Sequence, residues 1–250
     1  MRHIFFYPII LLLIVTSCSS RQYTISSIQG EYISVIAANK PDPEMAGLVN
    51  HYKKQLDDRM GKTIGYSTEY MPYTSYQSLL TNFTADVMVK LDVKYTGGQH
   101  VDLALMNVHG HRAAIPEGNI TVGDIFSTYS FENELVVLRL KGEYLNDIFK
   151  MYAGTGGAGI SNTLQIVSEN KKLVSAKVNG KPVEKDKIYT IVTLDYLAEG
   201  NDGMQALRKA ESATHTRLTL RDYILHYIQD KTAKGEKITS MLDERVVVKE

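Results

Sequence analysis

Three runs dominated by apolar residues constrain the fold of this chain more than any other feature of its sequence. They cover residues 101–106, 135–140 and 189–194. A strand with apolar side chains on both faces has to be covered on both sides, which is typical of sheets that pack against helices. Segments with helical spacing of apolar residues lie around these runs. The sequence therefore predicts a single mixed-sheet α/β (α+β) domain with flanking helices.

Several local signals place the helices. Asp42 followed by Pro43 combines a capping carboxylate with a proline in the first turn, so a helix is expected to begin there. Thr121 is the predicted N-cap of a short helix over residues 121–126. Helical spacing of apolar residues predicts further helices over residues 79–91, 142–152 and 220–228.

Turn residues place the remaining strands. Asn179-Gly180 is a strong hairpin signal, preceded by predicted strands over residues 164–167 and 173–178. Residues 33–37 could form one more strand. The glycine-rich segment 154–159 is expected to be a flexible loop.

Composition excludes several classes of protein. The 250 residues contain 28 Lys plus Arg and 28 Asp plus Glu, so the formal net charge is zero. This balance gives no electrostatic support for general nucleic-acid binding, although a local site for one small anion remains open. Cys18 is the single cysteine, which excludes an internal disulfide, a thiolate zinc site and an iron–sulfur cluster.

The position of Cys18 suggests a role for it. A basic start and an apolar run are followed by Thr16-Ser17-Cys18, which fits a signal peptide with a small-residue cleavage zone. The pattern resembles a bacterial lipobox, so residues 1–17 are expected to be a lipoprotein signal peptide and Cys18 the lipidation site. Residues 18–40 would then tether a domain over 41–250 to the cell envelope, facing the periplasm. The alternative is an ordinary secretory leader with an incidental cysteine.

The densest polar cluster, residues 107–112, directly follows the first buried run. Arg112 could bind phosphate or carboxylate, and Asn107 can donate and accept, which suits a base edge or a sugar hydroxyl. The alternative is a turn with solvated side chains. His109 and His111 raise the possibility of a metal site, but the sequence around them lacks a further ligand motif, so we expect no metal here.

Two more clusters adjoin the other buried runs. Phe131 and Asn133 precede one run, and Tyr196 and Asp202 follow another. Aromatic side chains at two strand ends could clamp a flat ligand, and Asp202 would hold a free carboxylate for sugar hydroxyls. The alternatives are that both aromatics are core residues and that Asp202 only stabilises its turn. The chain has no G-x-S-x-G nucleophile elbow, and segment 154–159 lacks the Lys-Ser/Thr of a P-loop.

At these clusters the sequence resembles the C-terminal, substrate-binding domain of the 5′-nucleotidase family. The family's Asn-x-Gly-Gly-Ile-Arg stands here as Asn107-Val108-His109-Gly110-His111-Arg112. The resemblance continues through Gly-x-Ile-Thr at 118–121, Phe-x-Asn at 131–133, Val-Asn-Gly-Lys-Pro at 178–182 and the aromatic-x-Ala-x-Gly-x-Asp-Gly motif at 196–203. It covers about residues 79–228.

The resemblance implies specific roles. Phe131 and Tyr196 would sandwich a nucleobase, Arg112 would lie near the phosphate or ribose, Asn107 near the base and Asp202 at the ribose hydroxyls. Asn133 of the Phe-x-Asn motif would belong to the same nucleotide-binding site.

Some positions depart from the family pattern. His109 and His111 replace a glycine and an isoleucine, and the side chain of His109 could crowd the ligand. Ser130 and Asn201 replace a proline and a glycine. Tyr76 stands where the family has a second arginine that grips phosphate.

The chain lacks the Asp-x-His, Gly-Asn-His and Gly-His-x-His motifs of the family's metallophosphoesterase domain. We therefore expect no catalytic residue, metal or cofactor in this chain. A separately encoded metallophosphoesterase with divalent metals would hydrolyse the nucleotide, and the two chains would form a split 5′-nucleotidase. The alternatives are an envelope module that binds a nucleoside or similar flat ligand without an enzymatic role, and a degenerate domain kept for protein contacts.

Overall fold

The computed structural model describes residues 23–34, 36, 40–72, 77–155 and 159–249. The chain divides into two compact units, residues 1–47 and 48–250. The predicted leader, Cys18 and Tyr76 lie outside the described residues, so the lipidation of Cys18 and the domain limits stay predictions. Within the described part of the chain, no helix combines the length and apolar character needed to cross a membrane.

The central sheet has five strands. In spatial order they are β10 (Ser212–Thr219), β4 (Glu134–Lys141), β9 (Ile188–Leu194), β2 (Leu103–Met106) and β5 (Gly159–Ile160). Strand β9 runs parallel to β2 and antiparallel to β4, so the sheet is mixed, as predicted. All of β2 and all but the first residue of β9 are buried. The apolar runs thus form the centre of the sheet.

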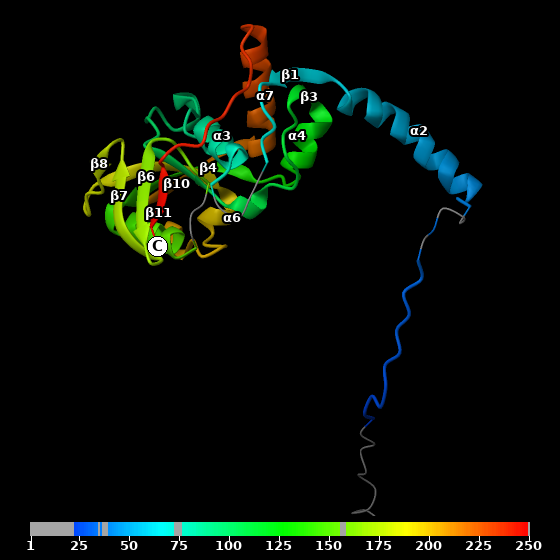
Figure 1. Cartoon of the computed structure of the whole chain (residues 1–250), viewed down its shortest axis with the longest axis horizontal. Coiled ribbons are helices and arrows are strands. Elements are labelled where there is room, and N and C mark those ends of the chain that lie inside the picture. The colour runs from blue at the N-terminus through cyan, green and yellow to red at the C-terminus, as the bar shows by residue number, and fades with distance from the viewer. Residues whose placement is uncertain (1–22, 35, 37–39, 73–76, 156–158, 250) are drawn as a thin grey trace, which may run out of the picture. The chain divides into compact units, whose positions relative to one another are not determined.

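A second sheet lies beside α5 and contains the predicted hairpins. Its spatial order is β11 (Val246–Lys249), β6 (Leu164–Glu169), β7 (Lys172–Val178) and β8 (Lys181–Pro182). Figure 1 shows the red β11 beside β6, to which it pairs in parallel. Asn179 and Gly180 have φ angles of 50° and 76°, the left-handed backbone that the predicted turn requires. The hairpin prediction is confirmed.

Six α-helices lie within the described residues. They are α2 (Pro43–Met60), α3 (Leu79–Met88), α4 (Val122–Thr128), α5 (Gly142–Thr155), α6 (Asp195–Ala198) and α7 (Leu220–Ala233). Helix α3 packs on β2 and β5, whereas α5 packs on β4 and on β6 and β7 of the second sheet. Each predicted helix is present, although α3 ends at Met88, before the predicted end at residue 91.

Capping explains where the helices begin. The Asp42 carboxylate accepts the backbone N–H groups of Glu44 and Met45, as expected for the start of α2. Thr121 caps α4 through a reciprocal pair of hydrogen bonds with Asp124, which confirms that prediction. Helix α5 begins directly after β4 at Gly142. Any other residue there would place its Cβ atom 2.1 Å from the backbone carbonyl oxygen of Glu184, so the close approach requires glycine.

Some local predictions were wrong. Ile33, Ser34 and Ile36 form no strand and are exposed, and no strand among the described residues pairs with them. Gly154 belongs to the last turn of α5 and Gly159 to β5, so only residues 156–158 of the predicted loop are left, and these lie outside the described residues.

Five strands were not predicted. They are β1 (Thr63–Ser67), β3 (Gly118–Thr121), β5, β10 and β11. Strands β1 and β3 form a separate two-stranded sheet, and β10 is an edge strand whose first four residues are exposed. Pairing with a distant partner makes such segments strands even where the apolar pattern is weak.

Candidate functional site

The three polar clusters meet where strands β2 and β9 of the central sheet end and where β4 begins. Strands β2 and β9 are parallel and end at this side of the sheet, and β4, which is antiparallel to β9, begins there. Strand β2 leads into the short 3-10 turn η2 (Val108–Gly110), and β9 leads into α6. Segments 107–112, 131–133 and 195–203 therefore converge, although up to 96 positions separate their residues in the sequence.

A cavity of about 280 Å³ lies where the segments converge. Its lining consists of Asn107, His109, Gly110, Arg112, Phe131, Asn133, Tyr196 and Asp202. The structure thus brings together all six side chains that the sequence singled out for nucleotide binding. Phe131 is 46% exposed and Tyr196 41% exposed, so neither is the core residue that the alternative interpretation required.

Asp202 links two walls of this cavity. Its carboxylate accepts a hydrogen bond of 2.7 Å from Asn107 Nδ2 and one of 3.0 Å from the Tyr196 hydroxyl. The expectation of a free carboxylate was therefore wrong: each oxygen already has one donor and keeps one accepting position. The hydrogen bond to Asp202 raises the pKa of Tyr196, with smaller contributions from burial and from the carboxylate charge. Asp202 has a φ angle of 51° between Gly200 and Gly203, which also adopt positive φ angles.

Asp195 orients another site residue. Its Oδ1 atom accepts hydrogen bonds from Asn133 Nδ2 at 3.0 Å and from the backbone N–H of Tyr196 at 2.7 Å. The bond to Asp195 fixes the orientation of the Asn133 amide. The Asn133 oxygen can then accept a hydrogen bond from a ligand. Asp195 is a positioning residue that sequence reasoning missed, and its place directly after a buried strand was the available signal.

Arg112 lies over the ring of Phe131, with its Cζ atom 4.9 Å from the ring centroid. The backbone N–H of Arg112 donates to the Thr128 carbonyl at 2.9 Å, which anchors the loop and leaves the side chain exposed. Within the described residues the Arg112 guanidinium forms no ion pair.

The two histidines of this loop have different environments. His109 is exposed on η2 and lines the cavity, whereas His111 is 1% exposed. They do not share one strand face, as the metal hypothesis assumed, because the chain turns at η2. No group of three or more His, Cys, Asp or Glu side chains among the described residues could hold a metal ion.

A buried hydrogen-bond network around Thr84 of α3 holds the loop over residues 107–112 in place. The Thr84 hydroxyl lies 2.8 Å from the Leu80 carbonyl oxygen, 2.9 Å from His111 Nε2 and 2.7 Å from the Tyr129 hydroxyl. A carbonyl can only accept, so the single hydroxyl proton of Thr84 goes to Leu80, and Thr84 accepts from both other groups. His111 therefore carries a proton on Nε2. Burial raises the pKa of Tyr129.

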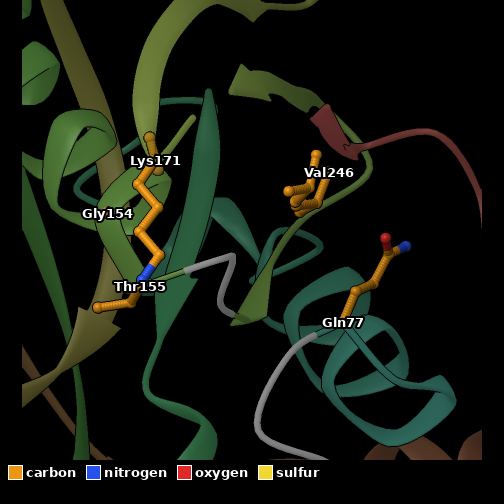
Figure 2. A pocket seen from close by; sticks show the side chains of 7 residues that line it. Gln77, Gly154, Thr155, Lys171 and Val246 are labelled. Atoms are coloured by element: carbon orange, nitrogen blue, oxygen red, sulfur yellow. The ribbon is translucent and has the colours of Figure 1, made fainter. Parts of the chain in front are cut away.

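A larger hollow of about 460 Å³ contains none of the six residues. Figure 2 shows Lys171 beside Thr155 on one side, with Val246 and Gln77 on the other. Gln77 and Thr155 adjoin sequence positions outside the described ranges, so the lining is described only in part. The smaller cavity is therefore the candidate site.

Comparison with known proteins agrees with this fold. A family model, "5′-nucleotidase, C-terminal domain", matches residues 63–209, which include all six residues. Protein UshA of Yersinia enterocolitica is 26% identical over 196 residues, which cover 75% of this chain and 34% of that protein. NAD 5′-nucleotidase of Haemophilus influenzae is 28% identical over 206 residues, which cover 70% and 33%.

Solved structures show the same fold. A 5′-nucleotidase precursor from Thermus thermophilus has a TM-score of 0.70 at 22% identity, over 84% of this chain and 44% of that one. The chain spans about a third of the length of the two relatives above. Because the family model matches more than half of the chain, this protein belongs to the 5′-nucleotidase C-terminal domain family.

Proposed function

We propose that the cavity at the end of β2 and β9 binds a nucleotide or nucleoside. The observation that carries this proposal is the pair of half-exposed aromatic side chains, Phe131 and Tyr196, on one cavity that also contains Arg112 and Asp202. Stacking on an aromatic side chain contributes about 1–3 kcal/mol per base. The two rings would sandwich the base, as the family resemblance implies.

The polar groups suit the rest of a nucleotide. Each oxygen of the Asp202 carboxylate can accept one more hydrogen bond, which fits neighbouring sugar hydroxyls. The guanidinium of Arg112 has no carboxylate partner among the described residues and would pair with the phosphate. Asn107 would contact the base, and the Asn133 oxygen, which Asp195 leaves available, would accept a donor from the ligand.

We further propose that a separate metallophosphoesterase supplies the hydrolytic chemistry and its divalent metals. One relative of this chain is named NAD 5′-nucleotidase, and the chain spans about a third of the length of that protein and of UshA. Lipidation of Cys18 would hold the binding domain at the periplasmic side of the cell envelope. Metabolic labelling with a fatty acid in the wild type and in Cys18→Ala tests the anchor.

Calorimetry with AMP and adenosine tests the binding proposal. Phe131→Ala and Tyr196→Ala should each weaken AMP binding about 5- to 150-fold, which corresponds to the loss of one stacking contact. Tyr70→Ala is the matched control, because Tyr70 is 57% exposed but does not line the cavity. No binding by the wild type, or equal affinities in all variants, would refute nucleotide binding.

Activity measurements test the split-enzyme proposal. We expect the purified chain with Mg²⁺ or Mn²⁺ to release no phosphate from AMP, and activity to depend on a metallophosphoesterase encoded beside it. Robust hydrolysis by the chain alone would overturn this assignment. Binding of AMP without any effect on the activity of that enzyme would favour an envelope binding module.

A further inference from the structure

The contact between Arg112 and Phe131 has a consequence for ligand selectivity. Both side chains line the candidate cavity, and the guanidinium lies over the ring that is proposed to stack the base. We infer that Arg112 and the ligand's base compete for Phe131, and that a negative charge on the ligand shifts this competition by drawing the guanidinium away. Arg112 would thereby favour phosphorylated over unphosphorylated nucleosides. This inference rests on the proposed nucleotide binding.

The surroundings of Arg112 leave it available for such a move. Asp202 accepts hydrogen bonds from Asn107 and Tyr196, and Asp195 accepts from Asn133 and the Tyr196 backbone. Among the described residues, the ring of Phe131 is the recorded partner of the guanidinium. The loop itself stays in place through its backbone bond to Thr128, so only the side chain has to move.

Arg221 offers a contrast within the same protein. Its guanidinium also lies over an aromatic ring, Phe126, at 4.4 Å. It additionally donates to the backbone carbonyls of Tyr129 and Ser130 and pairs with Glu132, and the residue is 7% exposed. Arg221 is thus held by several partners in a buried position, whereas the exposed Arg112 is held by one ring.

The two classes of ligand should respond to Arg112 with opposite signs. An exposed cation–π contact changes an equilibrium constant by only about 2- to 5-fold. A nucleoside gains nothing in return for displacing it, because it offers no anion. A nucleotide gains a charge-assisted hydrogen bond, which changes affinity about 10- to 100-fold. The net effect is selection for the phosphate, although the base occupies the same place in both ligands.

Calorimetry on the full chain with adenosine and AMP tests this inference. In Arg112→Ala, we expect adenosine to bind about 2- to 5-fold more tightly and AMP about 2- to 50-fold more weakly, because release of the Phe131 ring offsets part of the lost phosphate contact. Arg59→Ala is the control for net charge, because Arg59 is exposed on α2 and does not line the cavity. Circular dichroism checks that the exposed substitution leaves the fold intact.

The possible results separate the two proposals. If the wild type binds neither ligand, nucleotide binding itself is refuted. If the wild type binds both ligands and Arg112→Ala leaves adenosine affinity unchanged or lowers it, only the competition is refuted. Proton NMR gives a second readout: the Arg112 Hδ signals should lie upfield in the free protein because of the Phe131 ring current, and should lose this shift in Phe131→Leu.

Discussion

Replacing Thr84 with valine tests the buried network beneath the site loop. Thr84 is fully buried, and its hydroxyl accepts hydrogen bonds from His111 Nε2 and the Tyr129 hydroxyl. Valine has nearly the same shape but cannot accept either bond. The carbonyl of Leu80 loses only the Thr84 hydroxyl, because it keeps its partner in the helix. The substitution therefore leaves two buried donors without their acceptor.

The magnitude follows from these two donors. A buried polar group that loses its partner costs about 1–3 kcal/mol. Tyr129 is 3% exposed and should contribute this cost in full, and the loss of the His111 bond should add to it. Exchange of the hydroxyl for a methyl group recovers about 0.8 kcal/mol of hydrophobic stabilisation. We expect Thr84→Val to lower the free energy of unfolding by about 1–4 kcal/mol.

Urea denaturation measures this loss, and Thr128→Val is the matched control. Thr128 is also fully buried and also donates to the carbonyl four residues earlier, that of Asp124, at 2.8 Å. No side-chain donor bonds to it among the described residues, so valine there should cost less than about 1 kcal/mol. Adding Tyr129→Phe to Thr84→Val should recover about 1–2 kcal/mol, because the orphaned hydroxyl is removed. Equal losses in Thr84→Val and Thr128→Val would refute the network.

Three other predictions concern packing and charge. Arg245→Met should lower the free energy of unfolding by about 3 kcal/mol in urea, since the Arg245 side chain is 2% exposed and bonds two carboxylates; a loss below about 1 kcal/mol would contradict this. Burial raises the pKa of Asp243, but hydrogen bonds and charge from Arg245 outweigh it and lower that pKa, so this stabilisation is present above pH ~4 and lost below it. Asp243→Asn should therefore flatten the fall in stability between about pH 5 and 3, and an unchanged slope would argue against it. Gly142→Ala should cost more than about 2 kcal/mol because its Cβ would meet a carbonyl oxygen at 2.1 Å, whereas Gly154→Ala, with open space around it, should be neutral or stabilising by thermal melting.

Much of the fold could be predicted because its signals are local. The buried strands β2, β4 and β9 are apolar runs, and the Asn179-Gly180 turn needs a backbone conformation that few other residue pairs adopt. Strand β10 has no such signal: it is a strand because β4 offers it a free edge. Register and pairing of this kind depend on parts of the chain far apart in the sequence.

The residues of the site could be predicted from the sequence, but the contacts between them could not. Residue types and their places beside strand ends were sufficient to single out Phe131, Tyr196 and Arg112. Their contacts were not predictable, and the expectation for the Asp202 carboxylate was wrong because its partner Asn107 is 95 positions away. His111 stands where the family has an apolar residue. Its contact with Thr84 could not be predicted, because Thr84 belongs to α3, 27 positions earlier in the sequence.

The sequence by itself determined the helices, the buried strands, the caps, the turns and the set of polar side chains, since these depend on neighbouring residues and on apolar periodicity. The tertiary structure decided which of those side chains meet. Parallel β2 and β9 and antiparallel β4 bring their ends to the same side of the sheet, and only there does Arg112 contact Phe131 and Asn107 donate to Asp202. Hydrogen bonds and ring contacts act over a few ångströms, so only the folded chain can form them between such distant residues.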